Sequence, residues 1–416
     1  MYTKEKPVEL RELLAAKERR ADRQRSLLAE YRVPLISFSM NLAGEIKRFP
    51  LSDLLFQHAV SQITGRLGSP AHQETVRAGT GLEAIFIYRE KAEELKRFCL
   101  ELEEKLPAGR LLDLDVLDAD GRKLEREIPR RCLLCSEPAA ACARSRAHGL
   151  DAVKARTEEL LREAAPTILA DYAVDALLEE VRLTPKPGLV DQKDSGAHSD
   201  MTLALFEKSA EALRPYFRFA AACGMEDPDC MKPLQEAGRE AERVMYAATG
   251  GVNTHKGAIY AFGLILAAAG SCLVREDDLF LRAAALARAG KTGEEESHGS
   301  ALRKAGLKGG ARAEAEAGFP TARIGLAALE SRSGTDALME IILACRDSNL
   351  LWRGGEEGLS FARSYATRVL AAEGAEKDTL LAEMNREMIA RRLSPGGSAD
   401  LLALAMLLRK VKGVIL

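Results

Sequence analysis

"GRLLDLDVLDADG", residues 109–121, is the stretch that decides the fold class of the first part of this chain. Apolar and polar residues alternate along it, and a second alternating run, "RKLERE", follows the Asp-Ala-Asp-Gly sequence. Alternation with a period of two is typical of a β-strand, and an Asp-Gly pair favours a tight turn. The stretch therefore predicts a β-hairpin, and with it a domain that contains a sheet.

Two aspartates stand among the apolar residues of the first run. Side chains of a strand alternate between its faces, so Asp113 and Asp115 share one face, with Cα atoms roughly 6.6 Å apart. Two carboxylates presented in this way can hold Mg²⁺ together with substrate phosphates, which neutralises developing charge in phosphoryl and nucleotidyl transfer. A half-buried strand with its polar face in water explains the same spacing, so both interpretations stay open here.

The sequence around this stretch mixes strands and helices. "VPLISFSMNLAG" (33–44) and "GLEAIFIYRE" (81–90) predict strands, because both are rich in β-branched and aromatic residues. "KAEELKRFCLELEEKL" (91–106) predicts a helix that follows the second of them.

The length of the chain favours two domains, since 416 residues exceed one typical hydrophobic core. After about Leu150, helical stretches follow one another and are separated by loops rich in Gly and Pro. We predict an α+β domain over residues 1–150 and an all-α domain over residues 165–416, with the seam between Leu150 and Pro166.

Composition and charge exclude several classes of protein. The chain has 47% hydrophobic and 29% charged residues, as soluble globular proteins do, and its formal charge of -2 argues against nucleic acid as a partner. The uncharged run 257–274 approaches the length of a membrane span, but its glycines and its isolation favour a buried central helix. The first 28 residues predict an amphipathic helix without the apolar core of an export signal. We expect a cytoplasmic protein with reduced thiols and no membrane association.

"RRCLLCSEPAAACARSRAH" (130–148) contains three cysteines and a histidine, Cys132, Cys135, Cys142 and His148, with the spacing C-x2-C-x6-C-x5-H. The first pair has zinc-knuckle spacing, and three thiolates with one imidazole would close a tetrahedral structural zinc site. Small buried thiols at helix starts and turns explain the pattern equally well. A redox Cys-x-x-Cys is disfavoured, because no thioredoxin-like βαβ pattern surrounds it.

Four segments of the second half combine Gly, Pro and polar residues in a way that is typical of ligand-binding loops. They are "EVRLTPKPGLVDQKDSGAHSDM" (180–201), "GGVNTHKGAIYAFG" (250–263), "NLLWRGGEEG" (349–358) and "LSPGGSADLLALAMLL" (393–408). The N–H groups of a helix start and Lys256 would favour an anion, Arg353 beside two glycines would clamp phosphate, and Ser398 is predicted to cap the last helix. Each segment alone is explained by an ordinary loop, whereas together they predict a polyphosphate site.

These motifs also carry a resemblance to two known families. "TPKPGLVD", "GAHSDM", "GVNTHKGAI", "RGG" and "LSPGGSADLL", in this order from about Ala165 onward, closely resemble the triphosphoribosyl-dephospho-CoA synthase family of citrate lyase biogenesis. "PLISFSMNLAGEIK", "GRLLDLDVLDADG" and "RRCLLCSEPAAACARSRAH" resemble the apo-citrate lyase phosphoribosyl-dephospho-CoA transferase, or holo-citrate lyase synthase, over about Val8 to His148. The chain therefore resembles a natural fusion of the two.

The resemblance implies two successive reactions. In the second half, the 2′-hydroxyl of dephospho-CoA would displace adenine from ATP and give triphosphoribosyl-dephospho-CoA. In the first half, a serine of the citrate lyase acyl carrier protein, the gamma subunit, would attack the α-phosphorus of that product and expel pyrophosphate. Mg²⁺ is implied in both halves, and the first half would have a fold of nucleotidyltransferase type.

The resemblance and the loops together give the candidate site residues. Proton transfer in the second half would involve Asp191, His198, Asp200 and Glu180. Contacts with substrate or phosphate in that half would come from Lys186, Asn253, Thr254, His255, Lys256, Arg353, Gly354, Gly355, Ser394, Gly396, Gly397, Ser398 and Asp400. In the first half, substrate contacts would come from Asn41, Lys47 and Arg110, and Mg²⁺ would bind Asp113 and Asp115.

Two other functions remain compatible with the sequence. The same chemistry could serve the carrier protein of malonate decarboxylase, although "GAHSDM" and the fused first half favour citrate lyase. A zinc-stabilised module without catalysis could bind RNA or an acidic partner through the basic segment 122–148. The sequence also leaves open whether the protein forms a homo-oligomer.

Overall fold

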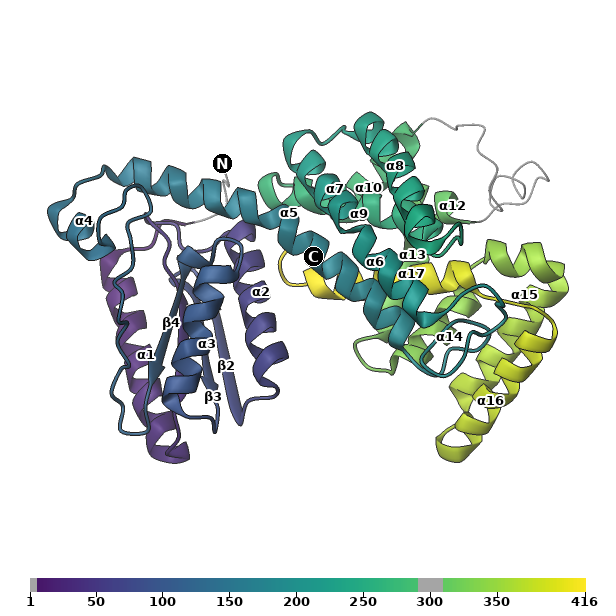
Figure 1. The fold of residues 1–416 in the computed structure, drawn as a ribbon, viewed down its shortest axis with the longest axis horizontal. Helices are drawn as coiled ribbons and strands as arrows, with labels where there is room; N and C mark the ends of the chain where they lie inside the picture. Colours follow the sequence, from purple (N-terminus) through teal and green to yellow (C-terminus); the bar gives the residue numbers. More distant parts are fainter. Residues whose placement is uncertain (1–5, 291–309) are drawn as a thin grey trace. The chain divides into compact units, whose positions relative to one another are not determined.

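The computed structural model describes residues 6–290 and 310–416, and the chain divides into two compact units, Met1–Ile168 and Leu169–Leu416 (Figure 1). The division falls within one long helix, α5 (Leu150–Arg182). The described residues are mostly helical, with one small antiparallel sheet in the first unit.

The sheet of the first unit has four antiparallel strands in the order β2-β3-β1-β4. Their bounds are β1 (Leu35–Met40), β2 (His72–Ala78), β3 (Gly81–Ile87) and β4 (Leu112–Leu117). The structure therefore confirms three predicted strands, those in residues 33–44, in residues 81–90 and in the first run of 109–121. β2 is mostly polar, without the β-branched and aromatic content of β1 and β3 or the alternation of β4, and it was not predicted.

The hairpin predicted around residues 118–121 is only half correct. The run "RKLERE" makes a single bridge to β4, between Leu117 and Lys123, and β4 pairs instead with β1. The physical reason is that this run has one leucine among charged residues, so it has too little apolar surface to bury as a full strand.

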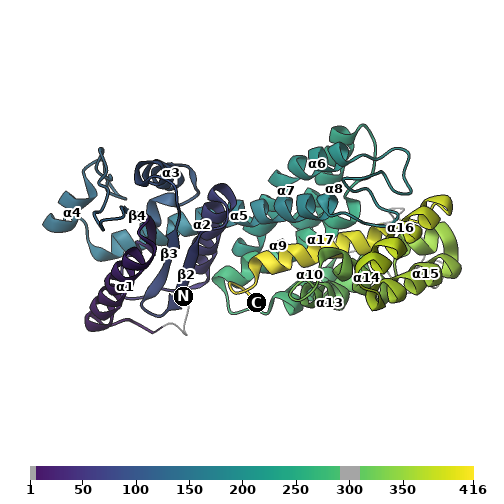
Figure 2. The same cartoon turned by 90° about the horizontal axis from the view of Figure 1, so that it is seen from below.

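Helices cover both faces of the sheet (Figure 2). α1 (Leu10–Tyr31) lies on the face of Ser37, where Gln24 donates a hydrogen bond to the serine hydroxyl at 2.7 Å. α2 (Pro50–Leu67) and α3 (Ala92–Lys105) lie on the other face, where the rings of Phe38 and Phe56 stack with centroids 4.8 Å apart. The aspartates of β4 share the more polar face, with Ser37 and α1.

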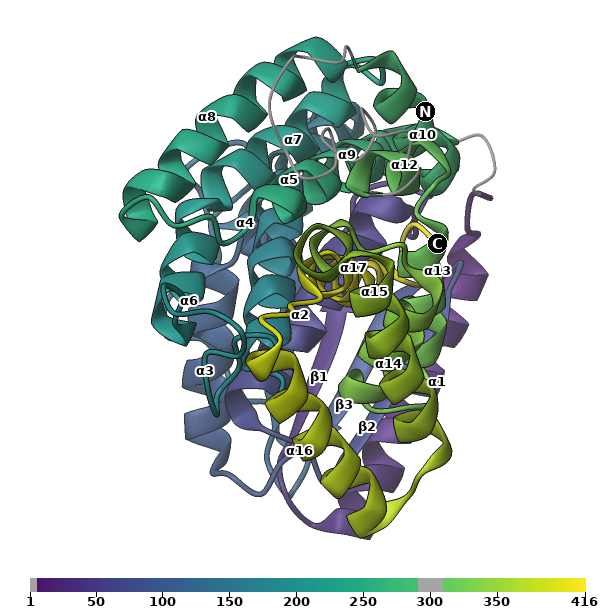
Figure 3. The ribbon, with the colours of Figure 1, turned by 90° about the vertical axis from the view of Figure 1, so that its right-hand side faces the viewer.

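The second unit is all helical in its described residues (Figure 3). Its helices after α5 are α6 (Leu203–Ala212), α7 (Arg214–Glu226), α8 (Met231–Thr249), α9 (Lys256–Val274), α10 (Leu279–Ala289), α12 (Ala311–Glu316), α13 (Pro320–Ala328), α14 (Gly334–Ala344), α15 (Ser348–Ala371), α16 (Gly374–Ala390) and α17 (Gly396–Val411). This arrangement confirms the predicted change from mixed to helical structure.

Helix α9 is the core of the second unit. Among the described residues it is the one helix long and apolar enough to cross a membrane, and 83% of its apolar window is buried inside the protein, as the sequence predicted. It packs against α7 backbone to backbone, since a Cβ atom at Gly224 would lie 1.8 Å from the carbonyl oxygen of Ala267. Glycine is required at this crossing because no side chain fits there.

Candidate active sites

A cavity of about 1010 Å³ lies among the helices of the second unit. α5, α8, α9 and α17 contribute to its wall, together with the loops that precede α9, α15 and α17. Its volume is at the upper end of the range for small-molecule sites, and polar and apolar groups share the wall. The cavity is therefore the candidate binding site of this unit.

Glu180 and Lys186 form a buried ion pair on the cavity wall. The Lys186 ammonium group donates to the Glu180 carboxylate at 2.5 Å, and both side chains are buried. Burial raises the pKa of Glu180, and the neighbouring ammonium group opposes this shift. The pairing favours the charged form of the carboxylate even in this buried position.

Asp400, on the first turns of α17, lines the same cavity. Its Oδ2 atom lies close against the start of α9, because a Cβ atom on Gly257 would be 2.0 Å from it. Within the described residues, Asp400 has no hydrogen-bond or ion-pair partner. Burial raises the pKa of Asp400 well above its usual range, and the charges of Glu180 and Asp347 raise it further. Asp400 therefore retains its proton to a higher pH than an ordinary carboxyl group.

Asp347 connects two elements of the wall. It is the N-cap of α15, where its Oδ1 atom accepts hydrogen bonds from the N–H groups of Asn349 and Leu350. Its Oδ2 atom accepts from the N–H and hydroxyl groups of Ser398, at 2.7 and 2.8 Å. Both oxygens are thus engaged, so Asp347 positions α15 and α17 and has little capacity left for a ligand.

The predicted N-cap role of Ser398 is wrong. Pro395 is the N-cap of α17, and Ser398 lies inside the helix with its side chain buried against Asp347. The carboxylate of Asp347 supplies the acceptor that the serine would have supplied as a cap, and this link spans 51 residues. Sequence reasoning that considers only neighbouring residues could not find it.

His198 lies between Ser394 and Arg353 on the cavity wall. His198 Nε2 is 2.9 Å from the Ser394 hydroxyl, and Nδ1 is 3.5 Å from an Arg353 nitrogen. Because arginine only donates, Nδ1 is the acceptor and Nε2 carries the proton in this arrangement. Burial lowers the pKa of His198, and the charge of Arg353 lowers it further, so the imidazole is neutral.

The predicted "RGG" loop lies within a helix. Arg353, Gly354 and Gly355 are part of α15, which has a kink at Gly355 (φ 61°). Leu393 packs so closely on Gly354 that a Cβ atom there would be 2.5 Å from a leucine methyl group. The glycines therefore serve the kink and the helix packing, while Arg353 alone lines the cavity.

The start of α9 forms one end of the cavity and carries the groups that sequence reasoning assigned to an anion. Asn253 accepts a hydrogen bond from the Lys256 N–H group at 3.3 Å, and the Lys256 ammonium group pairs with Glu242 at 2.8 Å. Behind them, Ser209 bonds both Thr254, at 2.7 Å, and His255 Nδ1, at 2.8 Å. Burial lowers the pKa of His255 to about 3, so this network contains a neutral imidazole. N–H groups at a helix start and a nearby ammonium group suit phosphate.

Two of the four predicted catalytic residues, Glu180 and His198, line the cavity, and the other two do not. Asp191 is buried, and its carboxylate accepts from three backbone N–H groups of its own loop at 2.6–3.1 Å. Asp200 is exposed. Of the predicted contacts at the start of α17, Ser394, Gly396, Gly397 and Asp400 lie on the wall, whereas Ser398 does not.

The sequence did not mark four carboxylates of the wall, among them Asp347 and Glu242; the other two are Glu236 and Glu314. Asp347 has only the pattern of an N-cap, and Glu242 occupies an ordinary position on the polar side of α8. Each reaches the cavity through packing between helices far apart in the sequence, for which no local signal exists.

The first unit presents its aspartates as the alternation predicted. Along β4, Leu112, Leu114 and Val116 are buried, and Asp113 and Asp115 are partly exposed on the other face. Asp115 pairs with Lys123 at 2.7 Å, and Asp113 lies 3.5 Å from Arg130. Two carboxylates with two adjacent cations could bind a metal ion and a polyphosphate side by side.

Three residues of the first unit, Asn41, Lys47 and Arg110, were predicted to contact substrate. Asn41 follows β1, and its N–H group donates to the Leu111 carbonyl at 2.8 Å, beside the start of β4. The Lys47 ammonium group donates to a backbone carbonyl of its own loop, and burial lowers its pKa. Arg110 donates to the carbonyl of Arg131. Asn41 and Arg110 therefore lie close to the start of β4, whereas the Lys47 ammonium group is bonded within its own loop.

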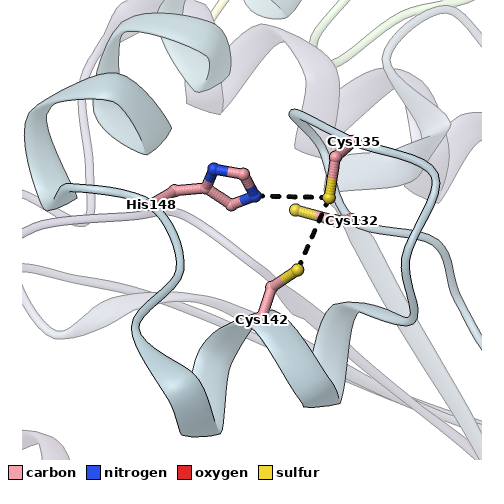
Figure 4. A group of neighbouring side chains, drawn as sticks. All are labelled: Cys132, Cys135, Cys142 and His148. Carbon is pink, nitrogen blue, oxygen red and sulfur yellow. Dashed lines mark hydrogen bonds between the residues drawn. The ribbon is translucent and has the colours of Figure 1, made fainter.

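The three cysteines and the histidine of residues 130–148 come together (Figure 4). One ligand atom from each of Cys132, Cys135, Cys142 and His148 lies within 4.8 Å of the others. The Cys135 and Cys142 sulfur atoms are 3.5 Å apart, and His148 Nε2 is 3.3 Å from the Cys135 sulfur. The cluster is therefore able to hold a metal ion.

Comparisons with known proteins agree with this division of the chain. Residues 166–414 match the family model CitG, ATP:dephospho-CoA triphosphoribosyl transferase, and residues 8–164 match CitX, apo-citrate lyase phosphoribosyl-dephospho-CoA transferase. Protein CitXG of Haemophilus influenzae is 33% identical over 98% of this chain and 97% of its own length. The 2-(5''-triphosphoribosyl)-3'-dephosphocoenzyme-A synthase of Haemophilus ducreyi is 36% identical over 66% of this chain and 98% of its own length.

Two units, each with its own group of carboxylates and cations, define a bifunctional transferase. The chain belongs to the family in which a CitX domain and a CitG domain are joined in one polypeptide. It is an enzyme of the biosynthesis and attachment of the citrate lyase prosthetic group.

Proposed function

We propose that each unit performs one of the two reactions at the site described above. The helical domain, residues 165–416, forms triphosphoribosyl-dephospho-CoA and adenine from ATP and dephospho-CoA. The first domain, residues 1–150, then transfers phosphoribosyl-dephospho-CoA to a serine of the citrate lyase acyl carrier protein, in the cytoplasm. The observation that carries this assignment is the pair of carboxyl groups, Glu180 and Asp400, in the large cavity of the helical unit.

These two carboxyl groups have opposite tasks in the displacement of adenine. Lys186 keeps Glu180 charged, so Glu180 accepts the proton of the 2′-hydroxyl as it attacks the ribose carbon. Asp400 has the higher tendency to be protonated, so its carboxyl group donates a proton to the departing adenine. A proton transfer from Glu180 to Asp400 then restores both groups for the next turnover.

The other residues of the cavity bind and orient the substrates. The triphosphate of ATP lies at the start of α9, where backbone N–H groups, Asn253 and Lys256 favour its charge. The hard oxygen donors of Glu242 fit Mg²⁺ beside those phosphates, and the ion would neutralise their charge. His198 and Arg353, fixed by their contacts, bind the second substrate from the opposite wall.

In the first unit, the aspartates of β4 are the metal platform. Asp113 and Asp115 present hard oxygen ligands from one face of one strand, which suits Mg²⁺ and a substrate phosphate. The ion would supply charge neutralisation for the departing pyrophosphate, and Lys123 and Arg130 add two cations there. This use of the two aspartates agrees with the fold of nucleotidyltransferase type that we propose for the first unit.

The assignment of the reactions to separate units is tested with the segment 150–416. It contains the whole of α5 and every residue of the cavity. We expect it to release adenine from ATP when dephospho-CoA is present, and to leave the carrier protein unmodified. A folded segment 150–416 that releases no adenine would overturn the assignment.

A further inference from the structure

We propose that Cys132, Cys135, Cys142 and His148 bind one structural zinc ion, which fixes the segment 118–149 on the first unit. This inference concerns the architecture of the transferase domain and does not depend on the assignment of the reactions. Three features of the segment support it: the distances between the ligand atoms, the local backbone structure, and the lack of buried apolar residues.

The distances between the ligand atoms fit a tetrahedral zinc site. With Zn–S bonds of about 2.3 Å and a Zn–N bond of about 2.0–2.1 Å, ligand sulfur atoms lie about 3.8 Å apart and the nitrogen lies about 3.5 Å from each sulfur. The Cys135–Cys142 sulfur distance is 3.5 Å, and His148 Nε2 lies 3.3 Å from the Cys135 sulfur. All four ligand atoms come from this one chain, so no position is left open for substrate, as in structural sites.

The backbone around the first two cysteines has the form of a knuckle. The Cys132 N–H group donates to the Glu137 carbonyl at 2.7 Å, and the Ala139 N–H group donates to the Arg130 carbonyl at 2.8 Å. Between these bonds, the Leu134 N–H group points to the Cys132 sulfur at 3.5 Å. N–H groups directed at sulfur favour the thiolate, which is the form that binds metal.

The other two ligands come from a short helix and the turn after it. Cys142 lies in α4 (Ala139–Ser145), and Arg146 ends this helix in the left-handed conformation (φ 49°). The chain then reverses and brings His148 back towards the thiols (Figure 4). A helix of seven residues is too short to be stable alone in water.

Hydrophobic burial cannot hold this segment in place. Of residues 118–149, Cys142 is the one that is buried, and Ile128 is 80% exposed. A stretch of this length loses considerable conformational entropy when it becomes ordered. Small units without a sufficient core use a metal or disulfides for this purpose, and the four ligands provide the metal site.

The zinc ion also fixes charged groups beside the aspartates of β4. Arg126 and Arg130 both pair with the buried carboxylate of Glu103 on α3. Arg130 also donates to the Leu112 carbonyl at 2.7 Å and lies 3.5 Å from Asp113. The knuckle begins directly after Arg130, so zinc binding holds this guanidinium group next to the metal platform.

Metal analysis of the full chain, purified without chelators or metal-affinity steps, tests the proposal. We expect about one zinc ion per chain, with X-ray absorption showing three sulfur ligands and one nitrogen ligand. Cys135→Ser should lose the zinc, whereas His148→Cys, which keeps four ligands, should retain it. Cys223→Ala removes a thiol of the helical unit and is the matched control that should retain the zinc.

Removal of zinc from the wild-type chain with a strong chelator gives a measurement that does not depend on a variant's folding. Proteolysis should then cut first within residues 118–149, which does not depend on the assignment of the reactions. With the reactions assigned as proposed above, and with Mg²⁺ supplied after the chelator is removed, carrier-protein labelling should fall at least tenfold and adenine release should stay unchanged. Metal-free wild-type protein with normal resistance to proteolysis would overturn the proposal. So would a Cys135–Cys142 disulfide in protein prepared under reducing conditions.

Discussion

In the function that we propose, Asp400 is the residue on which the chemistry of the helical unit depends most. It lines the cavity without a polar partner in the described part of the chain, and two other carboxylates raise its pKa further. Glu180, in contrast, pairs with Lys186, whose charge opposes the rise that burial gives to the pKa of Glu180. Neighbouring carboxyl groups with different tendencies to hold a proton are the arrangement from which an acid and a base arise.

Replacement of Asp400 by asparagine should lower the turnover of adenine release by about 10²- to 10⁴-fold, because the departing base would have no proton donor. The KM for ATP should change little. Wild-type turnover should also fall as the pH rises through the raised pKa of Asp400. Asp378→Asn, at an exposed position of α16, is the control. Equal rates for Asp400→Asn and the control would show that another group supplies the proton.

His58, in α2 of the first unit, makes this unit sensitive to acid. Burial lowers the pKa of His58 to about 4, and its side chain is 2% exposed. The unfolded chain protonates this imidazole near pH 6.5. Between pH 6.5 and pH 4 the unfolded chain therefore binds more protons than the folded chain, so the free energy of unfolding decreases as the pH is lowered. The loss from pH 7 to pH 5 should be about 2 kcal/mol.

Denaturant titrations of the wild type and His58→Gln at pH 7 and pH 5 measure this contribution. The wild type should lose about 2 kcal/mol more than the variant over this interval. Identical losses would mean that the imidazole is not the group that titrates.

At the scale of elements, the contact between α9 and α17 fixes the position of Asp400. Gly257 on α9 leaves room for the carboxylate, and a Cβ atom there would lie 2.0 Å from Asp400 Oδ2. The carboxyl group is thus placed by the helix pair and not by hydrogen bonds of its own.

Gly257→Ala should therefore displace the Asp400 carboxyl group and lower adenine release at least tenfold. The melting temperature should stay within a few degrees, because alanine favours the helix and offsets part of the displacement. Gly238→Ala on α8 is the matched variant, since its Cβ atom would make an ordinary contact of 3.5 Å with Tyr216. Similar activity of the two variants would argue against placement of Asp400 by this contact.

Elements with a clear local pattern could be predicted from the sequence, and elements without one could not. β-Branched and aromatic content predicted β1 and β3, the alternation of apolar residues predicted β4, and the uncharged composition predicted the buried helix α9. β2 is mostly polar and lies at the edge of the sheet, where a strand needs little apolar surface. Hydrogen bonding to β3 holds β2 as a strand, although the sequence of β2 alone does not indicate one.

The candidate sites followed the same rule. The cysteine cluster and the aspartate face could be predicted because their residues are neighbours in the chain. In the helical unit, the motifs predicted which loops form the site and two of its carboxylates, Glu180 and Asp400, but not Asp347. Asp400 and Asp347 lie on the wall because α17 and α15 pack together, whereas Asp200 is in a predicted loop and faces solvent.

At the scale of the whole molecule, one polypeptide has two compact units with chemically different sites. The cavity is lined by residues of the second unit alone, and the aspartate strand and cysteine cluster belong to the first. The two reactions should therefore be separable by single substitutions, with the product of the second unit as the substrate of the first.

Adenine release and the mass of the carrier protein, measured together for Asp400→Asn, Asp113→Asn and their mixture, test this most directly. Asp400→Asn should release little adenine and leave the carrier unmodified. Asp113→Asn should release adenine at the wild-type rate and leave the carrier unmodified, and the mixture should restore labelling. Loss of adenine release in Asp113→Asn, or normal carrier labelling by that variant alone, would contradict the division of the chemistry between the two units.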